Sequence, residues 1–142
     1  MIQRIQSIFL LLGAGASFGT LATPFANAEQ ATASSIFADQ VYNVQDNIIL
    51  LVLFAVAGAL AVASIFLYAN RITQMRLAMI ALVVNLAGLA FAVIYMLQQV
   101  NFASIAISIG IFLPLIAVIF LWLAHRNIRK DEKLVRSMDR LR

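Results

Sequence analysis

The sequence predicts an all-α polytopic membrane protein, a bundle of four transmembrane helices with both termini on the cytoplasmic side. The chain of 142 residues is 63% hydrophobic and 11% charged, whereas about a quarter of the residues in a soluble domain are charged. Its uncharged stretches accommodate four spans of about 20 residues each. All ten Lys and Arg residues fall on one side of these spans, and the positive-inside rule assigns that side to the cytoplasm.

The first two predicted spans cover residues 5–26 and 47–69, and each lies in a stretch without Asp, Glu, Lys or Arg. The first span also resembles a secretory signal peptide, because Ala26-Asn27-Ala28 places small residues just before a possible cleavage point. Its uncharged run is longer than the apolar core of a signal peptide, which has about 7–15 residues. We therefore expect the first span to be retained.

The third and fourth predicted spans cover residues 76–97 and 103–124. The stretch from Leu77 to His125 has no Asp, Glu, Lys or Arg, but it is too long for one crossing. A polar patch, Gln98-Gln99-Val100-Asn101, divides it and predicts a tight turn at the lipid–water boundary.

Charge distinguishes the connecting segments from one another. The only charged side chains of residues 27–46 are acidic, and this segment is expected outside the cytoplasm. Residues 125–142 are expected to form a basic, helical cytoplasmic tail. Within the outer loop, the spacing of apolar residues from Ile36 to Val44 predicts a short amphipathic helix at the outer interface or an outward extension of the second span. Such a helix rests on lipid or binds a partner.

Small residues recur at helical spacing in every span, and we expect them to pack the helices against one another. The alternative is that one face, such as the GxxxG step of the first span, docks a partner subunit. Asn85 is expected to hydrogen-bond with Ser64, Ser108 or a backbone carbonyl, and Pro114 is expected to kink the fourth span. The predicted helix-packing residues are Gly15, Gly19, Ala55, Ala59, Asn85, Gly88, Gly110 and Pro114.

The residue types that membrane chemistry needs are missing from the predicted spans. Apart from Arg76 at the first position of the third span, none contains Asp, Glu, Lys, Arg or His, which proton relays and ion-coupled transporters normally use. The chain has no cysteine and one histidine, which excludes disulfides, thiolate metal sites and a haem held by two histidines of one chain. We expect no enzymatic activity, no cofactor and no catalytic, metal-binding or cofactor-binding residues. His125 with Arg126 is the one pair to weigh for chemistry on lipids.

The basic tail is expected to contact anionic lipid headgroups at the cytoplasmic face or to dock a protein. It has no aromatic residue for base stacking, so no nucleic acid partner is expected. The predicted contact residues are Arg129, Lys130, Lys133, Arg136, Arg140 and Arg142.

The two ends of the chain, MIQRIQSIFLLL and IRKDEKLVRSMDRLR, resemble a family of small four-helix membrane proteins from Bacteroidota that is catalogued as a domain of unknown function. The resemblance covers essentially the whole chain. It implies a multi-pass protein of the bacterial inner membrane, and it supplies no activity, ligand or catalytic residue. Both end motifs face the cytoplasm in the predicted orientation.

Two functional hypotheses follow from these observations. The leading one is a non-enzymatic accessory or assembly subunit of a larger membrane complex, which has other membrane proteins as partners. The alternative is a carrier or pore for a small neutral or lipidic molecule. In that case the residues lining the path would be Ser64, Asn85, Ser104, Ser108 and Pro114.

Overall fold

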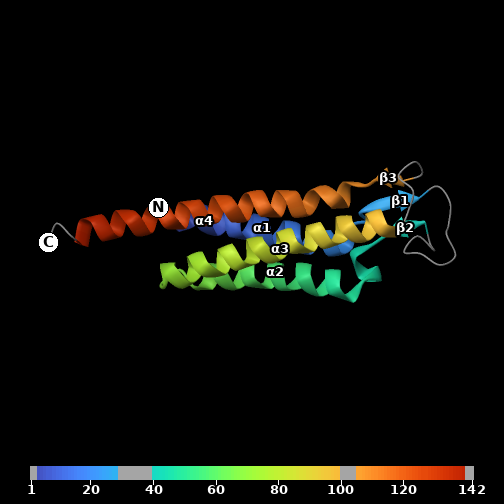
Figure 1. Cartoon of the computed structure of the whole chain (residues 1–142). Helices are drawn as coiled ribbons and strands as arrows, with labels where there is room; N and C mark the ends of the chain where they lie inside the picture. Colours follow the sequence, from blue (N-terminus) through green and yellow to red (C-terminus); the bar gives the residue numbers. More distant parts are fainter. Residues whose placement is uncertain (1–2, 29–39, 100–104, 140–142) are drawn as a thin grey trace.

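The computed structural model describes residues 3–28, 40–99 and 105–139, and within them it has the all-α four-helix bundle that the sequence predicts. The helices run alternately up and down, each packs against the next along the chain, and the last also packs against the first (Figure 1). All are long and apolar enough to cross a membrane. They are α1 (Gln3–Ala22), α2 (Ile48–Phe66), α3 (Arg71–Gln99) and α4 (Phe112–Asp139).

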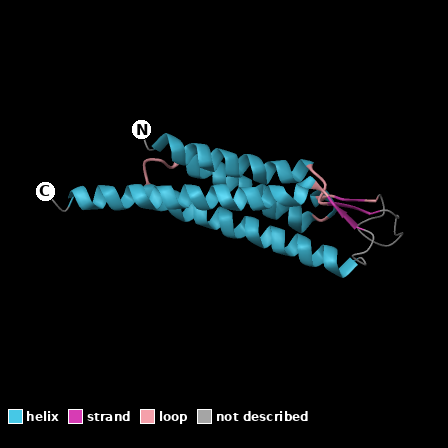
Figure 2. Ribbon diagram, turned by 90° about the horizontal axis from the view of Figure 1, so that it is seen from above, coloured by secondary structure: helices cyan, strands magenta, loops and turns pink. Residues whose placement is uncertain are grey.

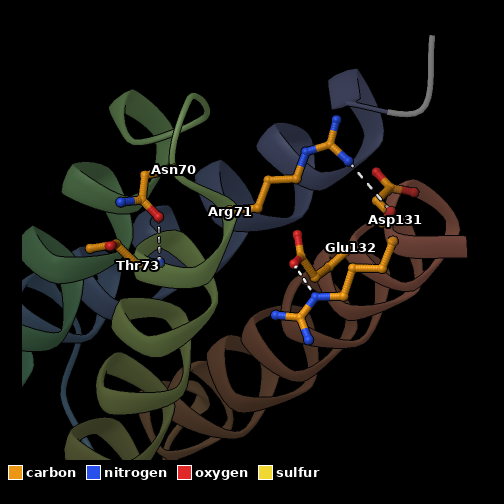
Figure 3. Close-up of polar contacts among 6 residues, drawn as sticks. Asn70, Arg71, Thr73, Asp131 and Glu132 are labelled. Carbon is orange, nitrogen blue, oxygen red and sulfur yellow. Dashed lines mark hydrogen bonds and ion pairs between the residues drawn. The ribbon is translucent and has the colours of Figure 1, made fainter. Parts of the chain in front are cut away.

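Local signals explain where these helices begin and end. The side chain of Asn47 accepts a hydrogen bond from a backbone N–H in the first turn of α2 at 2.9 Å, which satisfies a group that the helix leaves free. Asn70 does the same for α3, where its side chain accepts from the Thr73 N–H at 3.2 Å (Figure 3). Helix α1 ends shortly before Pro24, because a proline disfavours the helical conformation at the residue preceding it.

Helices α3 and α4 do not begin where the predicted spans begin. Helix α3 begins at Arg71, before the predicted start at residue 76, because Asn70 caps it there. Helix α4 begins at Phe112 rather than at residue 103. Pro114 therefore lies in the first turn of α4, where its missing N–H would have no helical partner anyway. The reason for expecting a kink at Pro114 does not apply at this position.

A small antiparallel sheet, which the sequence did not predict, lies at one end of the bundle (Figures 1 and 2). In the described part of the chain it consists of β1 (Ala26–Ala28), β2 (Val41–Tyr42) and β3 (Ile105–Ile107), with β1 in the centre. Ala26 pairs with Tyr42 on one side and Ile107 on the other. The segment that resembles a cleavage site is thus the central strand of the sheet.

The described part of the outer loop contains no α-helix. Residues 41–42 form β2, and residues 44–46 form a short 3-10 helix, η1 (Val44–Asp46). The first residues of the expected amphipathic helix, Ile36 and Phe37, lie outside the described residues.

The hydrophobic core has a different character at each end. Near the sheet it is aromatic: the ring of Phe25 meets those of Tyr42 and Phe54 edge to face, with centroids 5.8 and 6.0 Å apart. In the other half, buried alanines alternate with Leu10, Leu121 and similar side chains, which lets the helices approach closely. The large side chains that face outward are mainly apolar, as lipid contact requires.

Candidate functional site

The described basic side chains gather at the end of the bundle opposite the sheet. We call it the basic end: the start of α1, the turn between α2 and α3 with the first turns of α3, and residues 122–139 of α4 (Figures 1 and 2). The Lys and Arg side chains that the structure describes all belong to it. They are Arg71, Arg76, Arg126, Arg129, Lys130, Lys133 and Arg136.

A buried polar contact joins the first and last helices at the basic end. The Gln6 amide of α1 donates a hydrogen bond to the Asp131 carboxylate of α4, and these residues are only 4% and 8% exposed. The Arg71 guanidinium of α3 donates to the backbone oxygen of Asp131 at 3.4 Å (Figure 3). These contacts hold α4 against α1 and α3 as far as Asp131.

This contact was not predicted, although the sequence carries a signal for it. Ala124 and Ile128 are fully buried in the bundle, and Asp131 follows them at the helical spacing of four and then three residues. It therefore continues their face of α4. Reading that face past the end of the apolar stretch would have placed Asp131 inside the bundle.

Beyond Asp131, α4 continues past the ends of the other helices (Figures 1 and 2). We call residues 132–139 the α4 extension; at 1.5 Å per residue it is about 12 Å long. Two of its apolar side chains, at positions 134 and 138, are one turn apart, and Leu134 is 54% and Met138 62% exposed. On the opposite side of the helix, Arg136 forms an ion pair of 2.8 Å with Glu132 (Figure 3).

The helical period sorts the exposed basic residues into two groups. Lys130 lies one turn before Leu134 and therefore on the side of the apolar stripe, whereas Arg129 lies on the opposite side of α4. Of the predicted contact residues, Arg129, Lys130, Lys133 and Arg136 are all exposed. Arg140 and Arg142 lie outside the described residues.

An open hollow of about 340 Å³ lies between α3 and α4 at the basic end. Its surface is almost entirely apolar, although a charged residue and an imidazole contribute to it. The lining residues are Met75, Arg76, Met79, Ile80 and His125.

His125 and Arg126, weighed above as a pair for chemistry on lipids, make separate contacts. The Nδ1 atom of His125 lies 3.2 Å from the backbone oxygen of Met75; because a carbonyl only accepts, Nδ1 carries the proton in this contact. The Arg126 guanidinium lies over the ring of Trp122, 5.4 Å from its centroid, as in a cation–π interaction. The two side chains therefore have different partners.

The interior polar residue Asn85 has a partner that differs from those expected. Its Nδ2 donates to Ser17 Oγ of α1 at 2.6 Å, and both side chains are fully buried. Ser64 instead donates to a carbonyl of its own helix at 2.8 Å, and Ser108 precedes α4 at the sheet end. Ser104 lies outside the described residues. The candidate polar residues that the structure describes therefore do not line a common path.

The predicted packing glycines divide into close and open positions. A Cβ atom added at Gly19 would meet Leu113 of α4 at 2.8 Å, and one at Gly88 would meet the Phe54 ring of α2 at 3.1 Å. At Gly15 it would meet nothing within 4 Å. The two glycines of the GxxxG step thus face different surroundings, and only the second contacts another helix of this chain.

The other predicted packing positions are equally mixed. Gly110 is buried against the backbone of Pro24, whose oxygen would lie 2.2 Å from an added Cβ atom. Ala55 is half-buried, Ala59 is exposed and Pro114 is buried. Close approaches also occur at Gly13 and Gly58, where added Cβ atoms would meet Leu121 and Phe18 at 2.9 and 2.8 Å. Spacing within one helix does not reveal which side faces a neighbour.

The chemistry available at the basic end is positive charge, apolar contact and hydrogen bonding. In the described ranges, no group of three or more His, Cys, Asp or Glu side chains is placed to hold a metal ion. A sequence model for a family described as "Domain of unknown function (DUF4293)" matches residues 2–141. Comparisons with curated proteins and with solved structures return no match.

Proposed function

The chain belongs to the DUF4293 family, and from that premise we propose that it is a non-enzymatic accessory or assembly subunit of a larger membrane complex. The four apolar helices make it a multi-pass membrane protein. The resemblance of its end motifs supports a location in the inner membrane of a bacterium from Bacteroidota. The positive-inside rule supports a cytoplasmic position for the basic end.

The observation that carries the proposal is the α4 extension. Leu134 and Met138 expose more than half of their surface, although they lie in a charged segment beyond the predicted membrane span. At 1.5 Å per residue, Lys133 lies about 13 Å beyond Ala124, the last residue of the fourth predicted span. A headgroup layer is about 5–8 Å thick and surface potentials decay over about 8 Å. Most of the extension therefore projects past the headgroups, where a protein surface is the better partner.

The chemistry of the extension indicates what that partner surface contains. The apolar stripe of Leu134 and Met138 needs an apolar counterpart, and the neighbouring Lys130 favours acidic residues around it. Glu132 is already paired with Arg136 on the other side of the helix. We therefore propose a partner membrane protein that offers an acidic, amphipathic cytoplasmic segment.

The interior of the bundle favours this role over that of a carrier or pore. A path for a neutral molecule would need polar groups along a shared route. Asn85 is instead paired with Ser17 in the core, Ser64 bonds within its own helix, and Ser108 lies at the sheet end. These positions support a packed structural bundle.

Site-specific cross-linking tests the docking role. A photo-activatable amino acid is placed at Leu134 or Met138 of the full chain in its native membrane, with position 129 on the opposite side of α4 as the matched control. We expect positions 134 and 138 to capture the same membrane protein, identified by mass spectrometry as having an acidic segment at the adduct. Adducts to lipid alone, or capture only from position 129, would contradict the proposal.

Cysteine labelling tests the orientation on which the proposal depends. Because the chain has no cysteine, Lys133→Cys and Asn27→Cys each introduce a single reporter on an exposed position, one at each end of the bundle. A membrane-impermeant maleimide is expected to label Asn27→Cys in spheroplasts and Lys133→Cys only after lysis. The reverse pattern would place the basic end outside.

A further inference from the structure

The open hollow between α3 and α4 is not used by the proposed docking role, which involves the α4 extension. Along α3, Met75 and Met79 are one turn apart, and so are Arg76 and Ile80, so that these four residues form two adjacent ridges along the hollow. His125 contributes from α4. Since Met79 and Ile80 are 40% and 48% exposed, the hollow opens to the outside of the bundle and not into its core.

The position of the hollow along the helices matches the boundary between lipid and water. Trp122, whose surface is half exposed, lies on α4 close to the hollow and carries Arg126 over its ring. Tryptophan and arginine concentrate at this depth of a membrane, where an apolar surface meets charged headgroups. A molecule that reaches the hollow from the bilayer therefore has its polar end at the same level as Arg76.

The apolar lining matches an acyl chain, and Arg76 adds a positive charge for an anionic end. Methionine side chains are flexible and adapt to an irregular apolar ligand, and a volume of about 340 Å³ is within the range of small-molecule sites. Arg76 is exposed at the same place, and a guanidinium binds phosphate oxygens through two parallel hydrogen bonds. The acidic side chains described nearby, Asp131 and Glu132, already have partners.

We propose that this hollow is a binding site for one anionic phospholipid, whose acyl chain lies against Met75, Met79 and Ile80 and whose phosphate is held by Arg76. The contact between His125 and the Met75 carbonyl fixes the spacing of α3 and α4 at the site. The ligand comes from the bilayer and not from solution, because the apolar lining provides most of the contact surface. The proposal does not depend on the accessory role.

Native mass spectrometry of the full chain in detergent tests the proposal. The protein is titrated with phosphatidylglycerol, with phosphatidylcholine of the same acyl chains, and with inorganic phosphate. We expect the protein to retain one phosphatidylglycerol in preference to phosphatidylcholine. We expect free phosphate to bind less than phosphatidylglycerol and not to displace it. Equal retention of both lipids would overturn the anionic assignment, and binding or competition by free phosphate would overturn the lipid assignment.

Two variants locate the site, and a third controls for charge. Arg76→Gln is expected to weaken retention of phosphatidylglycerol about tenfold, since it removes a charged hydrogen bond. Met79→Trp fills the hollow without changing charge and is expected to weaken it as well. Arg136→Gln, on the α4 extension, removes the same charge away from the hollow and is expected to have no effect. Wild-type retention in the first two variants, or equal loss in all three, would overturn the site.

Discussion

Gly110→Ala and Gly15→Ala are the same chemical change at two positions that the sequence presents as equivalent small residues. An added Cβ atom at Gly110 would lie 2.2 Å from the backbone oxygen of Pro24, whereas one at Gly15 would meet nothing within 4 Å. Because ordinary contact begins near 3.4 Å, the backbone at Gly110 or at Pro24 must retreat by more than 1 Å. The two variants should therefore have opposite effects on stability.

The size of the effect at Gly110 follows from the contacts that such a retreat disturbs. The Gly110 N–H donates to the Pro24 oxygen at 3.2 Å, and the Ser108 N–H donates to the Phe25 oxygen at 2.9 Å. Each backbone hydrogen bond contributes about 0.5–1.5 kcal/mol, and overpacking costs about 1–3 kcal/mol. We expect Gly110→Ala to lower the free energy of unfolding by about 2–6 kcal/mol. Gly15→Ala is expected to raise it by up to about 1 kcal/mol through helix propensity.

The assay is reversible unfolding of the purified full chain in mixed micelles with increasing dodecyl sulfate, followed by fluorescence of the single tryptophan. The Gly110→Ala midpoint should fall well below that of the wild type, and the Gly15→Ala midpoint should stay level or rise. If both variants unfold at the wild-type midpoint, the close approach of Gly110 to Pro24 is refuted. If Gly15→Ala lowered the midpoint as much as Gly110→Ala, it would refute the conclusion that Gly15 has open space where Gly110 has a close contact.

Three further predictions concern individual polar groups. Asn85→Ala and Ser17→Ala in a double-mutant cycle should give a coupling free energy of about 0.6–1.7 kcal/mol, and additive losses would exclude the hydrogen bond between them. Asp131→Ala should speed amide hydrogen exchange at the end of α4 and destabilise the protein by about 1–3 kcal/mol, because it leaves the buried Gln6 amide unpaired; Asp131→Asn, which keeps an acceptor, should retain most of the protection. Burial raises the pKa of the Tyr42 phenol above its usual value of 10.0. Above about pH 10 the unfolded chain therefore loses this proton before the folded chain does. The free energy of unfolding then falls by about 1.4 kcal/mol per pH unit. Tyr42→Phe should remove this part of the alkaline loss, and an unchanged pH profile would contradict the shift.

The helices were predictable because their signals are long and independent of the fold. Uncharged runs of membrane-spanning length determine the four spans, and the tertiary structure only shifts their ends. The shift at α3 comes from Asn70, a capping residue that could have been recognised in the sequence. The shift at α4 comes from β3, which forms only because residues 105–107 pair with Ala26–Ala28 far along the chain. Strand pairing of this kind has no local signal in such short segments.

The polar contacts were less predictable because they depend on which sides of the helices pack together. Asn85 needed a partner, and the sequence offered several serines. Only the arrangement of the four helices, which places α1 across the core from α3, selects Ser17. Likewise, the sequence of the basic tail suggests a segment exposed to water throughout. In the structure α4 packs beside Gln6, and Asp131 is therefore buried. The hollow at Met75 and Met79 arises from the fit of two helices and leaves no pattern in either one.

The most direct test of the accessory role is purification of the tagged full chain from its native membranes in a mild detergent, beside Lys130→Glu and Arg129→Glu. Both residues are exposed and both variants reverse one charge, but only Lys130 lies on the side of Leu134 and Met138. We predict that the wild type and Arg129→Glu elute with a second membrane protein in fixed stoichiometry, and that Lys130→Glu elutes without it. Elution of the wild type alone, as a monomer or homo-oligomer, would contradict the accessory role.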